Sequence, residues 1–141
     1  MWIDQIVDGS LKTSQVQYTY RYYDKFGITT QLAPLTNKIQ VIDPNRAKET
    51  GNAQDTTTSI GFKLIIKNTN EYSKFKRLQI FRLSYITPGE NAKVELIYDG
   101  DVPSNQKDFA FNDVGTTPLQ ELTMEEFSAM SGMIVIPTVI E

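Results

Sequence analysis

Acidic side chains are the first candidates for chemistry in this sequence. The stretch YDGDVPSN contains Asp99 and Asp101, and Asp108 and Asp113 follow further along the chain. Closely spaced carboxylates can bind calcium, but an EF-hand loop would continue with further oxygen ligands and end in a glutamate, which this stretch does not do. Asp, Gly and Asn also favour turns. We therefore interpret the stretch as a turn, and we expect no metal-binding residue.

Aromatic rings are concentrated in VQYTYRYYDKFG, residues 16–27, where five Tyr or Phe residues occur within twelve. Such rings could stack on bases or sugars. The alternate positions from Val16 to Tyr22 would equally share one face of a half-buried strand, whose tyrosines bury their rings and keep their hydroxyls at the rim. We favour the strand. Tyr23 and Phe26 lie off that face and close to the turn, and we retain them as residues that could contact a partner.

The basic cluster of the sequence consists of Lys74, Lys76, Arg77 and Arg82. Arg77 and Arg82 differ in parity along the predicted strand, so we expect them on opposite faces as solvated or paired charges. The net charge of the chain is -3 at pH 7, which provides no large positive field for phosphates. The segments GTTPLQ and TPGENA lack the motif of a phosphate-binding loop and its helix. We expect no nucleic-acid partner.

The sequence contains no histidine and no cysteine among its 141 residues. Thiol catalysis, Cys/His zinc sites, histidine bases and the Ser-His-Asp triad are therefore excluded. An enzyme would have to work through carboxylates, Lys, Tyr, Ser or Thr, and the sequence indicates no pair of carboxylates for acid-base work. We expect no catalytic residue and no cofactor.

Runs of apolar residues predict the elements that would position these side chains. Residues 16–32 indicate a hairpin that turns at DKFG. Pro34 then indicates an edge crossing or a kink, and residues 43–58 an exposed, mobile loop. Residues 75–86 have apolar side chains in both phases, which indicates a central strand covered on both faces or a bulge. The predicted strands are 16–22, 28–32, 38–42, 59–67, 75–86, 93–100 and 109–113.

One helix is predicted, at residues 124–131. Thr123 and Glu126 would form its capping box, and Gly132 stands where a left-handed C-terminal cap would fall. The segment MIVIPTVIE, residues 133–141, is apolar and strand-like. A chain that ends there suggests either excision from a longer polypeptide or a segment that pairs with a partner.

About seven short strands and one late helix favour an all-β sandwich over an α/β fold. We expect residues 1–141 to form a single domain, with a core at about 9–115 and the helix and C-terminal strand at 122–141. A chain of this length can bury a core without disulfides or metal. Its apolar runs are only a few residues long, which is too short to span a membrane.

The order of these segments resembles the opening of fibronectin type III-like modules in tail and virion proteins of tailed bacteriophages. Tyr18 and Tyr20 stand in the Y-x-Y strand of that pattern, and Asp24 to Gly27 form its polar turn. Pro34 stands in its Ser/Thr-Pro crossing, and residues 40–42 in the strand that follows. This resemblance implies an immunoglobulin/fibronectin type III-like sandwich.

The second half of the chain is similar to the same modules. The matching positions are Arg77, Ile80, Phe81 and Arg82 in an R-I-x-I-Y-R strand, and Phe111, Asp113 and Gly115 in an F-x-D-x-G-like turn. LQELTMEEFSAMSG resembles the segment that follows such modules in tail or stabilisation proteins of crAss-like phages. The resemblance covers about residues 9–132. This sequence departs from the family's pattern at Phe81, where the pattern has a tyrosine, and in its long loop at 43–58.

The resemblance implies a non-enzymatic structural module of a tail or portal-proximal virion protein that acts in subunit assembly. Its partners would be other virion subunits, in a symmetric oligomer formed through the full-length protein. It would be made in the bacterial host cytoplasm and reside in the virion tail. One alternative is a module that binds carbohydrate or the host surface through its aromatic rings or the 43–58 loop. Another is an enzyme that works through carboxylates.

Overall fold

Alternating apolar residues form the strands at Ser14–Tyr23 and Ile60–Ile66, as the sequence predicts. The computed structural model describes residues 1–42, 57–67, 75–87, 89–102, 108–115 and 117–130. Residues 124–130 are helical. Gly132, the segment 133–141 and most of the 43–58 loop lie outside the described residues. The strands in the described part are β1 (Trp2–Asp8), β2 (Ser14–Tyr23), β3 (Ile39–Val41), β4 (Ile60–Ile66), β5 (Arg77–Tyr85), β6 (Lys93–Asp101), β7 (Phe109–Asp113) and β8 (Gln120–Leu122).

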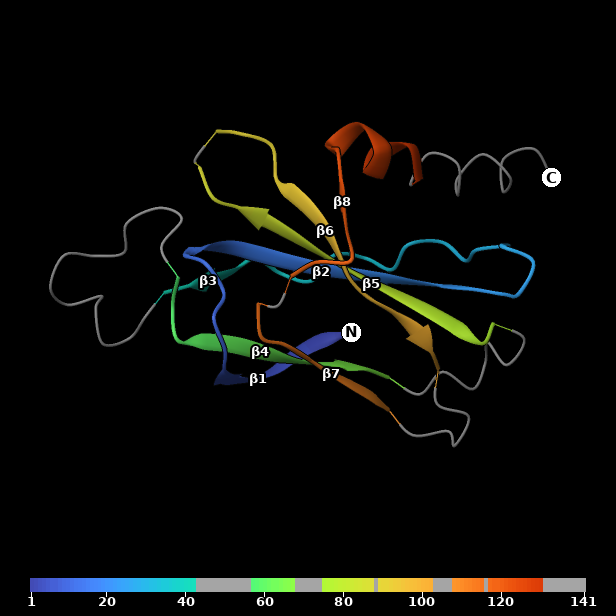
Figure 1. Cartoon of the computed structure of the whole chain (residues 1–141), viewed down its shortest axis with the longest axis horizontal. Helices are drawn as coiled ribbons and strands as arrows, with labels where there is room; N and C mark the ends of the chain where they lie inside the picture. Colours follow the sequence, from blue (N-terminus) through green and yellow to red (C-terminus); the bar gives the residue numbers. More distant parts are fainter. Residues whose placement is uncertain (43–56, 68–74, 88, 103–107, 116, 131–141) are drawn as a thin grey trace, which may run out of the picture.

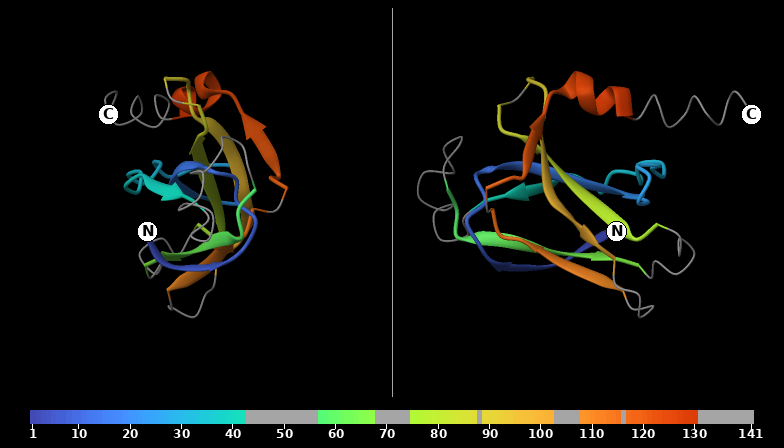
Figure 2. Two further views of the ribbon diagram at one scale, coloured as in Figure 1. Left: turned by 90° about the vertical axis from the view of Figure 1, so that its left-hand side faces the viewer. Right: turned by 45° about the vertical axis from the view of Figure 1, so that its right-hand side comes forward.

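The strands form two sheets that lie face to face (Figure 1). The smaller sheet has the order β1-β4-β7, and the larger has the order β3-β2-β5-β6-β8. Every pairing is antiparallel. Figure 2 shows the helix on the side of the larger sheet that faces away from the smaller one. The predicted all-β sandwich with one short helix near the C-terminal end is confirmed.

The core between the sheets comes mainly from β2, β4 and β5. Val16, Tyr18 and Tyr22 of β2 are buried, and Tyr20 is partly buried against the same cluster. The four alternate apolar residues of β4, from Ile60 to Ile66, pack against them. Each fully buried apolar side chain stabilises the fold by roughly 1.5–3 kcal/mol. The tyrosine-rich segment is therefore a sandwich strand that supplies the core.

Strand β5 lies at the centre of the larger sheet and is covered on both faces. Leu78 and Ile80 point into the core between the sheets, while Phe81 and Leu83 belong to a second cluster under the helix. The pairing of β5 with β6 shifts register between Ile80 and Phe81, as a bulge does. The extra residue of this shift is Ile97 of β6, and β5 pairs with β2 without a shift. Coverage on both faces therefore explains the out-of-phase apolar residues of β5, and a bulge in β5 does not.

The helix begins at a capping box and covers the outer face of the larger sheet. The Glu126 amide donates to the Thr123 hydroxyl over 3.0 Å, and the Thr123 amide donates to the Glu126 carboxylate over 2.9 Å. Phe127 is buried and meets the Phe81 ring edge-on, with ring centroids 6.2 Å apart. The predicted capping box is confirmed.

The predicted return strand at 28–32 is wrong. Residues 28–38 run beside β2 and form hydrogen bonds with it, but instead of a regular ladder they form an isolated β-bridge between Tyr23 and Thr29. Thr30 and Thr36 form hydrogen bonds with the backbone of β2 through both their amides and their hydroxyls. The amide of Thr30 donates to the Tyr22 carbonyl, and the Thr30 hydroxyl accepts from the Tyr22 amide, both over 2.9 Å. Thr36 makes the same reciprocal pair with Tyr18. Side-chain oxygens therefore protect this edge of β2 in a segment that Pro34 prevents from forming a regular ladder.

Strands β1 and β8 were not predicted. Pairing of β1 with β4 shifts register between Ile3 and Gln5, so the apolar residues of β1 fall out of a simple alternation. Strand β8 has only three residues, Gln120–Leu122. Neither element carries a clear period-two pattern.

A buried ion cluster joins the two sheets. Arg82 of β5 donates to Asp113 of β7 over 2.6 Å and to Glu95 of β6 over 2.9 Å. The Tyr18 hydroxyl of β2 donates to the second Asp113 oxygen over 2.6 Å. All four side chains are buried. The Gly115 amide also donates to Asp113 over 3.3 Å, in a turn where Gly115 has a φ of 81°.

The surroundings of this cluster keep Tyr18 and Arg82 in fixed protonation states. Burial raises the pKa of Tyr18 well above 10.0, and the charge of Asp113 and its hydrogen bond raise it further. Burial alone would lower the pKa of Arg82, but Asp113 and Glu95 oppose this, and the pKa ends above its ordinary value. Arg82 is therefore cationic and Tyr18 neutral at neutral pH.

Replacing Arg82 should destabilise the sandwich far more than replacing Arg77, which lies on the same strand. Arg82→Leu leaves Asp113 buried without its cation and leaves Glu95 with only the Lys93 ammonium, 3.9 Å away. We expect a loss of about 3–5 kcal/mol in the free energy of unfolding. Arg77→Leu is the matched control, because its ion pairs with Asp99 and Asp101 are partly or fully open to solvent and should contribute less. Urea unfolding of the three proteins measures the difference. Equal losses for both variants would contradict the structural role of Arg82.

Candidate functional site

Tyr23 and Phe26, the residues predicted to contact a partner, have different surroundings. Tyr23 lies on the outer face of the larger sheet, where its hydroxyl donates to Asp99 over 2.5 Å and accepts from Arg77 Nε over 3.0 Å. Phe26 lies at the tip of the following turn, and 76% of its surface is exposed. Tyr23 therefore has a role within the fold, whereas Phe26 faces solvent. Partner contact by either residue stays a prediction.

Tyr23 belongs to a polar network on the outer face of the larger sheet. Arg77 donates to Asp101 over 2.9 Å, and Gln79 donates to Asp99 over 3.3 Å. Burial and the Asp99 hydrogen bond raise the pKa of Tyr23, although Arg77 opposes the shift. The predicted placement of Arg77 and Arg82 on opposite faces, each in ion pairs, is confirmed.

The acidic stretch that suggested calcium supplies partners to this network. Asp99 and Asp101 are joined to Tyr23 and Arg77, and Asp113 is committed to the buried cluster with Arg82. Among the described residues, no group of three or more acidic, histidine or cysteine side chains is arranged to hold a metal ion. Arginine and tyrosine thus supply the positive and hydrogen-donating groups that satisfy these carboxylates.

The turn after β2 is held in one conformation by Asp24. One carboxylate oxygen of Asp24 accepts from the amides of Phe26 and Ile28, over 2.8 and 2.9 Å. The Asp24 backbone exchanges two further hydrogen bonds with Gly27 and Ile28. Gly27 has a φ of 83°, which glycine adopts without strain. This turn presents Phe26 and Ile28 outward, with 76% and 59% of their surfaces exposed.

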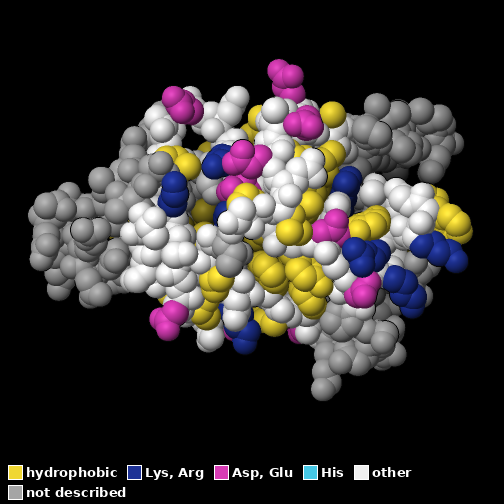
Figure 3. All heavy atoms as spheres, viewed as in Figure 1, with side chains coloured by type: hydrophobic (Ala, Val, Ile, Leu, Met, Phe, Trp, Pro, Cys, Tyr) yellow, Lys and Arg dark blue, Asp and Glu magenta, His cyan; other side chains and the backbone are white. Residues whose placement is uncertain are grey.

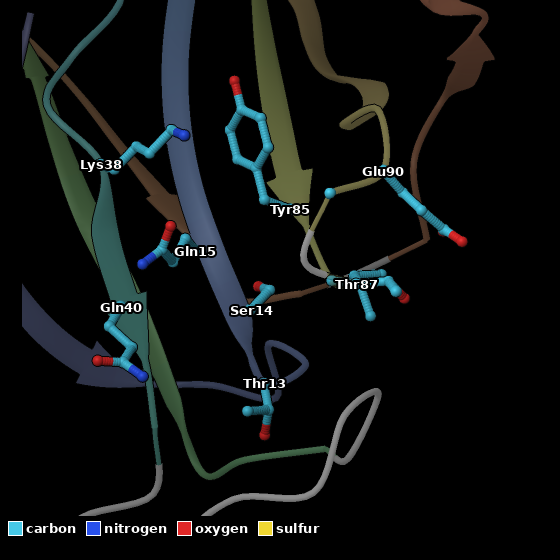
Figure 4. A pocket seen from close by; sticks show the side chains of 10 residues that line it. Thr13, Ser14, Gln15, Lys38, Gln40, Tyr85, Thr87 and Glu90 are labelled. Carbon is cyan, nitrogen blue, oxygen red and sulfur yellow. The ribbon is translucent and has the colours of Figure 1, made fainter.

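A hollow of about 590 Å³ lies at the opposite end of β2 (Figure 4). Gln40 of β3, Gln15 of β2 and Tyr85 of β5 pair across three neighbouring strands and form its floor. Lys38 lies 4.1 Å from the centre of the Tyr85 ring, and the Tyr85 hydroxyl donates to Gln17 over 2.7 Å. The residues that complete the lining are Thr13, Ser14, Ile86, Thr87, Gly89 and Glu90.

The chemistry available in this hollow is hydrogen bonding. A glutamine amide can donate and accept at the same time, which suits the paired hydroxyls of a sugar or the backbone of a peptide. Two further hollows, beside Arg82 and beside Tyr20, measure about 360 and 420 Å³. Each of these three hollows contains at most one carboxylate, either Glu90 or Glu95. None of the three offers two convergent acids.

The sequence analysis retained Phe26 as a possible contact residue but did not include Ile28, which is also exposed. The Asp-x-x-Gly turn signal from Asp24 to Gly27 could have indicated that Ile28 is held outward as well. Gln15, Gln40 and Tyr85 meet only through strand pairing, and Gln15 and Tyr85 are 70 positions apart in the sequence. No local pattern could have brought them together.

The surface around the turn after β2 is mixed in character. Figure 3 shows apolar and basic side chains gathered at the end of the molecule where this turn lies. Lys25 lies beside the Phe26 ring, with its ammonium 5.1 Å from the ring centre. In the described part of the chain, no helix has the length and apolar character that a membrane crossing requires.

Comparison with known proteins identifies the family. The family model described as Crassvirus muzzle protein matches residues 2–141. No curated protein matches the chain. The match extends over almost the whole sequence and therefore covers both sheets, the inter-sheet ion cluster and the turn after β2. It makes the chain a virion protein of crAss-like phages, with other virion subunits as partners. The chain belongs to the Crassvirus muzzle protein family.

Proposed function

We propose that this chain is a non-enzymatic structural module of the phage tail that acts in subunit assembly. The family match over residues 2–141 carries the proposal. Two features of the fold support it: a sandwich held rigid by a buried ion cluster, and a fixed turn that exposes Phe26 and Ile28. Such a unit can repeat weak contacts in a symmetric assembly, where multiplicity strengthens them.

In this role the chain would act within a larger assembly. The 141 residues would be one domain of a longer tail or portal-proximal polypeptide, which forms the symmetric oligomer as a full-length protein. The protein would be made in the bacterial host cytoplasm and then join the virion tail. Catalysis has no part in this role.

The strand order also supports an immunoglobulin/fibronectin type III-like module. In variable-type immunoglobulin domains, strands C′, C, F and G form one sheet, and B pairs with E in the other. The order β3-β2-β5-β6 and the pair β1-β4 reproduce these neighbours, and the six strands follow the same chain order. The additional strands β7 and β8 extend the two sheets. We propose that the module is a variant of this architecture.

Purified virions should carry this chain on the tail. Mass spectrometry of virions from the source phage should detect its peptides in a fixed ratio to known tail subunits. Antibodies against the isolated domain should label the tail in electron micrographs, with an antibody against a capsid subunit as the control. Absence of the peptides from virions, or labelling of the capsid alone, would contradict the proposal.

A second candidate function is recognition of a carbohydrate or another polar host-surface ligand. The hollow floored by Gln15, Gln40 and Tyr85 favours it, because amides and hydroxyls line a space of about 590 Å³. Lys38 already lies against the Tyr85 ring, so we expect hydrogen bonding to contribute more than ring stacking.

Substitution of the two glutamines tests this second function. If the hollow binds host polysaccharide, Gln15→Ala/Gln40→Ala should weaken that binding about tenfold, since each lost hydrogen bond contributes about 0.5–1.5 kcal/mol. Saturation-transfer NMR with polysaccharide from the host surface provides the measurement. Gln5→Ala, an exposed glutamine on β1 of the other sheet, is the matched control. Failure of the unaltered chain to bind any host polysaccharide would rule this function out.

A further inference from the structure

Strand β1 forms a free edge of the smaller sheet. In the described part of the chain, it pairs with β4 on one side and with no strand on the other. It has seven residues, whereas the other edge strands β3, β7 and β8 have three, five and three. Natural proteins often protect such edges with short strands, prolines or lysines. β1 is the longest of these edges and contains neither proline nor lysine, so its outer backbone groups can receive another strand.

The side chain of Ile6 is uncovered on the core-facing side of this edge. Residues that pair across two strands share a face of the sheet, and Ile6 pairs with Phe62, which is fully buried in the core. Ile3 lies in the same phase, opposite the buried Leu64, and packs against the core cluster. Ile6, by contrast, exposes 61% of its surface. A further strand beside β1 would cover it.

The immunoglobulin-like strand order has a strand at this place. In those domains one sheet has the order A-B-E-D, so strand B lies between A and E. β1 and β4 take the places of B and E, and β7 lies on the far side of β4, as D does. The place of A, beside β1, holds no strand of the described residues. The occupant that fits this edge is therefore an extended segment that becomes a new edge strand.

One segment of this chain outside the described residues has the composition of such a strand. Residues 133–141 read MIVIPTVIE, and six of the nine are β-branched, which favours a strand. Pro137 restricts that strand to the edge of a sheet, which is the position that an addition to β1 would take. Glu141 is its only charged side chain, so the segment brings little repulsion toward Asp4 and Asp8 of β1.

This segment cannot pair along its whole length with β1 of its own chain. The helix that precedes it lies on the outer face of the larger sheet, whereas β1 belongs to the smaller sheet on the other side (Figure 2). Packed sheets are about 10 Å apart, and the helix adds a further layer. Residues 131 and 132, which link the described helix to the segment, can span at most about 7 Å. A strand formed by the whole segment must therefore come from a second copy.

We propose that residues 133–141 of one copy add to the free edge of β1 in a second copy and fill the place of strand A. The added strand would cover Ile6 on one face of the sheet and Trp2, which is 43% exposed and lies in the opposite phase, on the other. Each copy gives the strand from one surface and receives it on another, so the contact is head-to-tail and can build rings or filaments. The inference rests on the proposed assembly role and names the partner of that role.

Sedimentation velocity of the full chain over a range of concentrations tests this pairing. The unaltered chain should associate reversibly into dimers and larger species. Ile6→Lys places a charge where the added strand would lie, and Ile134→Pro/Val135→Pro disrupts the added strand itself. Neighbouring residues of a strand direct their amides to opposite sides, so one of the two prolines removes an amide that faces β1. Each variant should weaken association at least about tenfold.

Leu119→Lys is the matched control for Ile6→Lys. Leu119 is 62% exposed, close to the 61% of Ile6, but it lies next to β8 in the larger sheet. The same substitution there should leave the association unchanged. An equal effect of the two lysines, or an unaltered chain that stays monomeric at every concentration, would overturn the proposal.

A mixture of the two weakened variants provides the sharpest measurement. Ile6→Lys still offers its C-terminal segment, and Ile134→Pro/Val135→Pro still offers its β1, so together they can form one intact contact. The resulting pair has no second intact edge or segment and should stop at a heterodimer. A mixture that associates no more strongly than its components would contradict the exchange of this strand.

A peptide of residues 133–141 provides a second readout in the Ile134→Pro/Val135→Pro chain. Trp2 is the only tryptophan of the sequence and lies on β1, so its fluorescence should change and saturate as the peptide binds. The same peptide with both proline substitutions is the control and should have no effect. Unchanged fluorescence with the unsubstituted peptide would overturn the proposal. That result would leave the tail location standing, whereas absence from the virion would overturn the assembly role and leave a measured association intact.

Discussion

The buried ion cluster around Arg82 is the interaction on which the arrangement of the two sheets depends. It joins β5 and β6 of the larger sheet to β7 of the smaller one, and Tyr18 adds β2. Charges in a packed interior are tolerated only when their partners stay in place. A slip of β5 against β6, or of one sheet over the other, would leave a carboxylate or the guanidinium unpaired. The cluster thus fixes register as well as distance, in a core that is otherwise apolar and non-directional.

This constraint separates the parts of the chain that hold the fold from those that can meet a partner. Most of the reactive-looking side chains prove to be structural: Asp113 lies in the core, and Asp99, Asp101 and Arg77 form a network on the outer sheet face. In the turn after β2, by contrast, the Asp24 carboxylate accepts hydrogen bonds from backbone amides of the turn itself, and the Phe26 and Ile28 side chains face solvent. An ordered surface of this kind would lose less conformational entropy if a partner bound there.

Sequence patterns predicted the sandwich because alternation is a local property. The β2 tyrosines, β4 and the Thr123–Glu126 cap all followed from period and spacing. The edge of β2 was mispredicted, since the reciprocal bonds of Thr30 and Thr36 imitate a strand without forming one. The Arg82–Asp113 pair and the Gln15–Gln40–Tyr85 floor join residues that are distant in sequence. Composition alone does not encode such partners, so these features required the three-dimensional structure.

A double-mutant cycle between Arg82 and Asp113 tests most directly whether their ion pair couples the sheets. The unfolding free energy would be measured for the unaltered chain, Arg82→Leu, Asp113→Leu and the double variant. Because each single change strands a buried charge or reduces its compensation, the double variant should lose less than the sum of the two single losses, by about 1–3 kcal/mol. Losses that add to within roughly 0.5 kcal/mol would show that the two residues act independently, and they would contradict the dependence of the two-sheet arrangement on this ion pair.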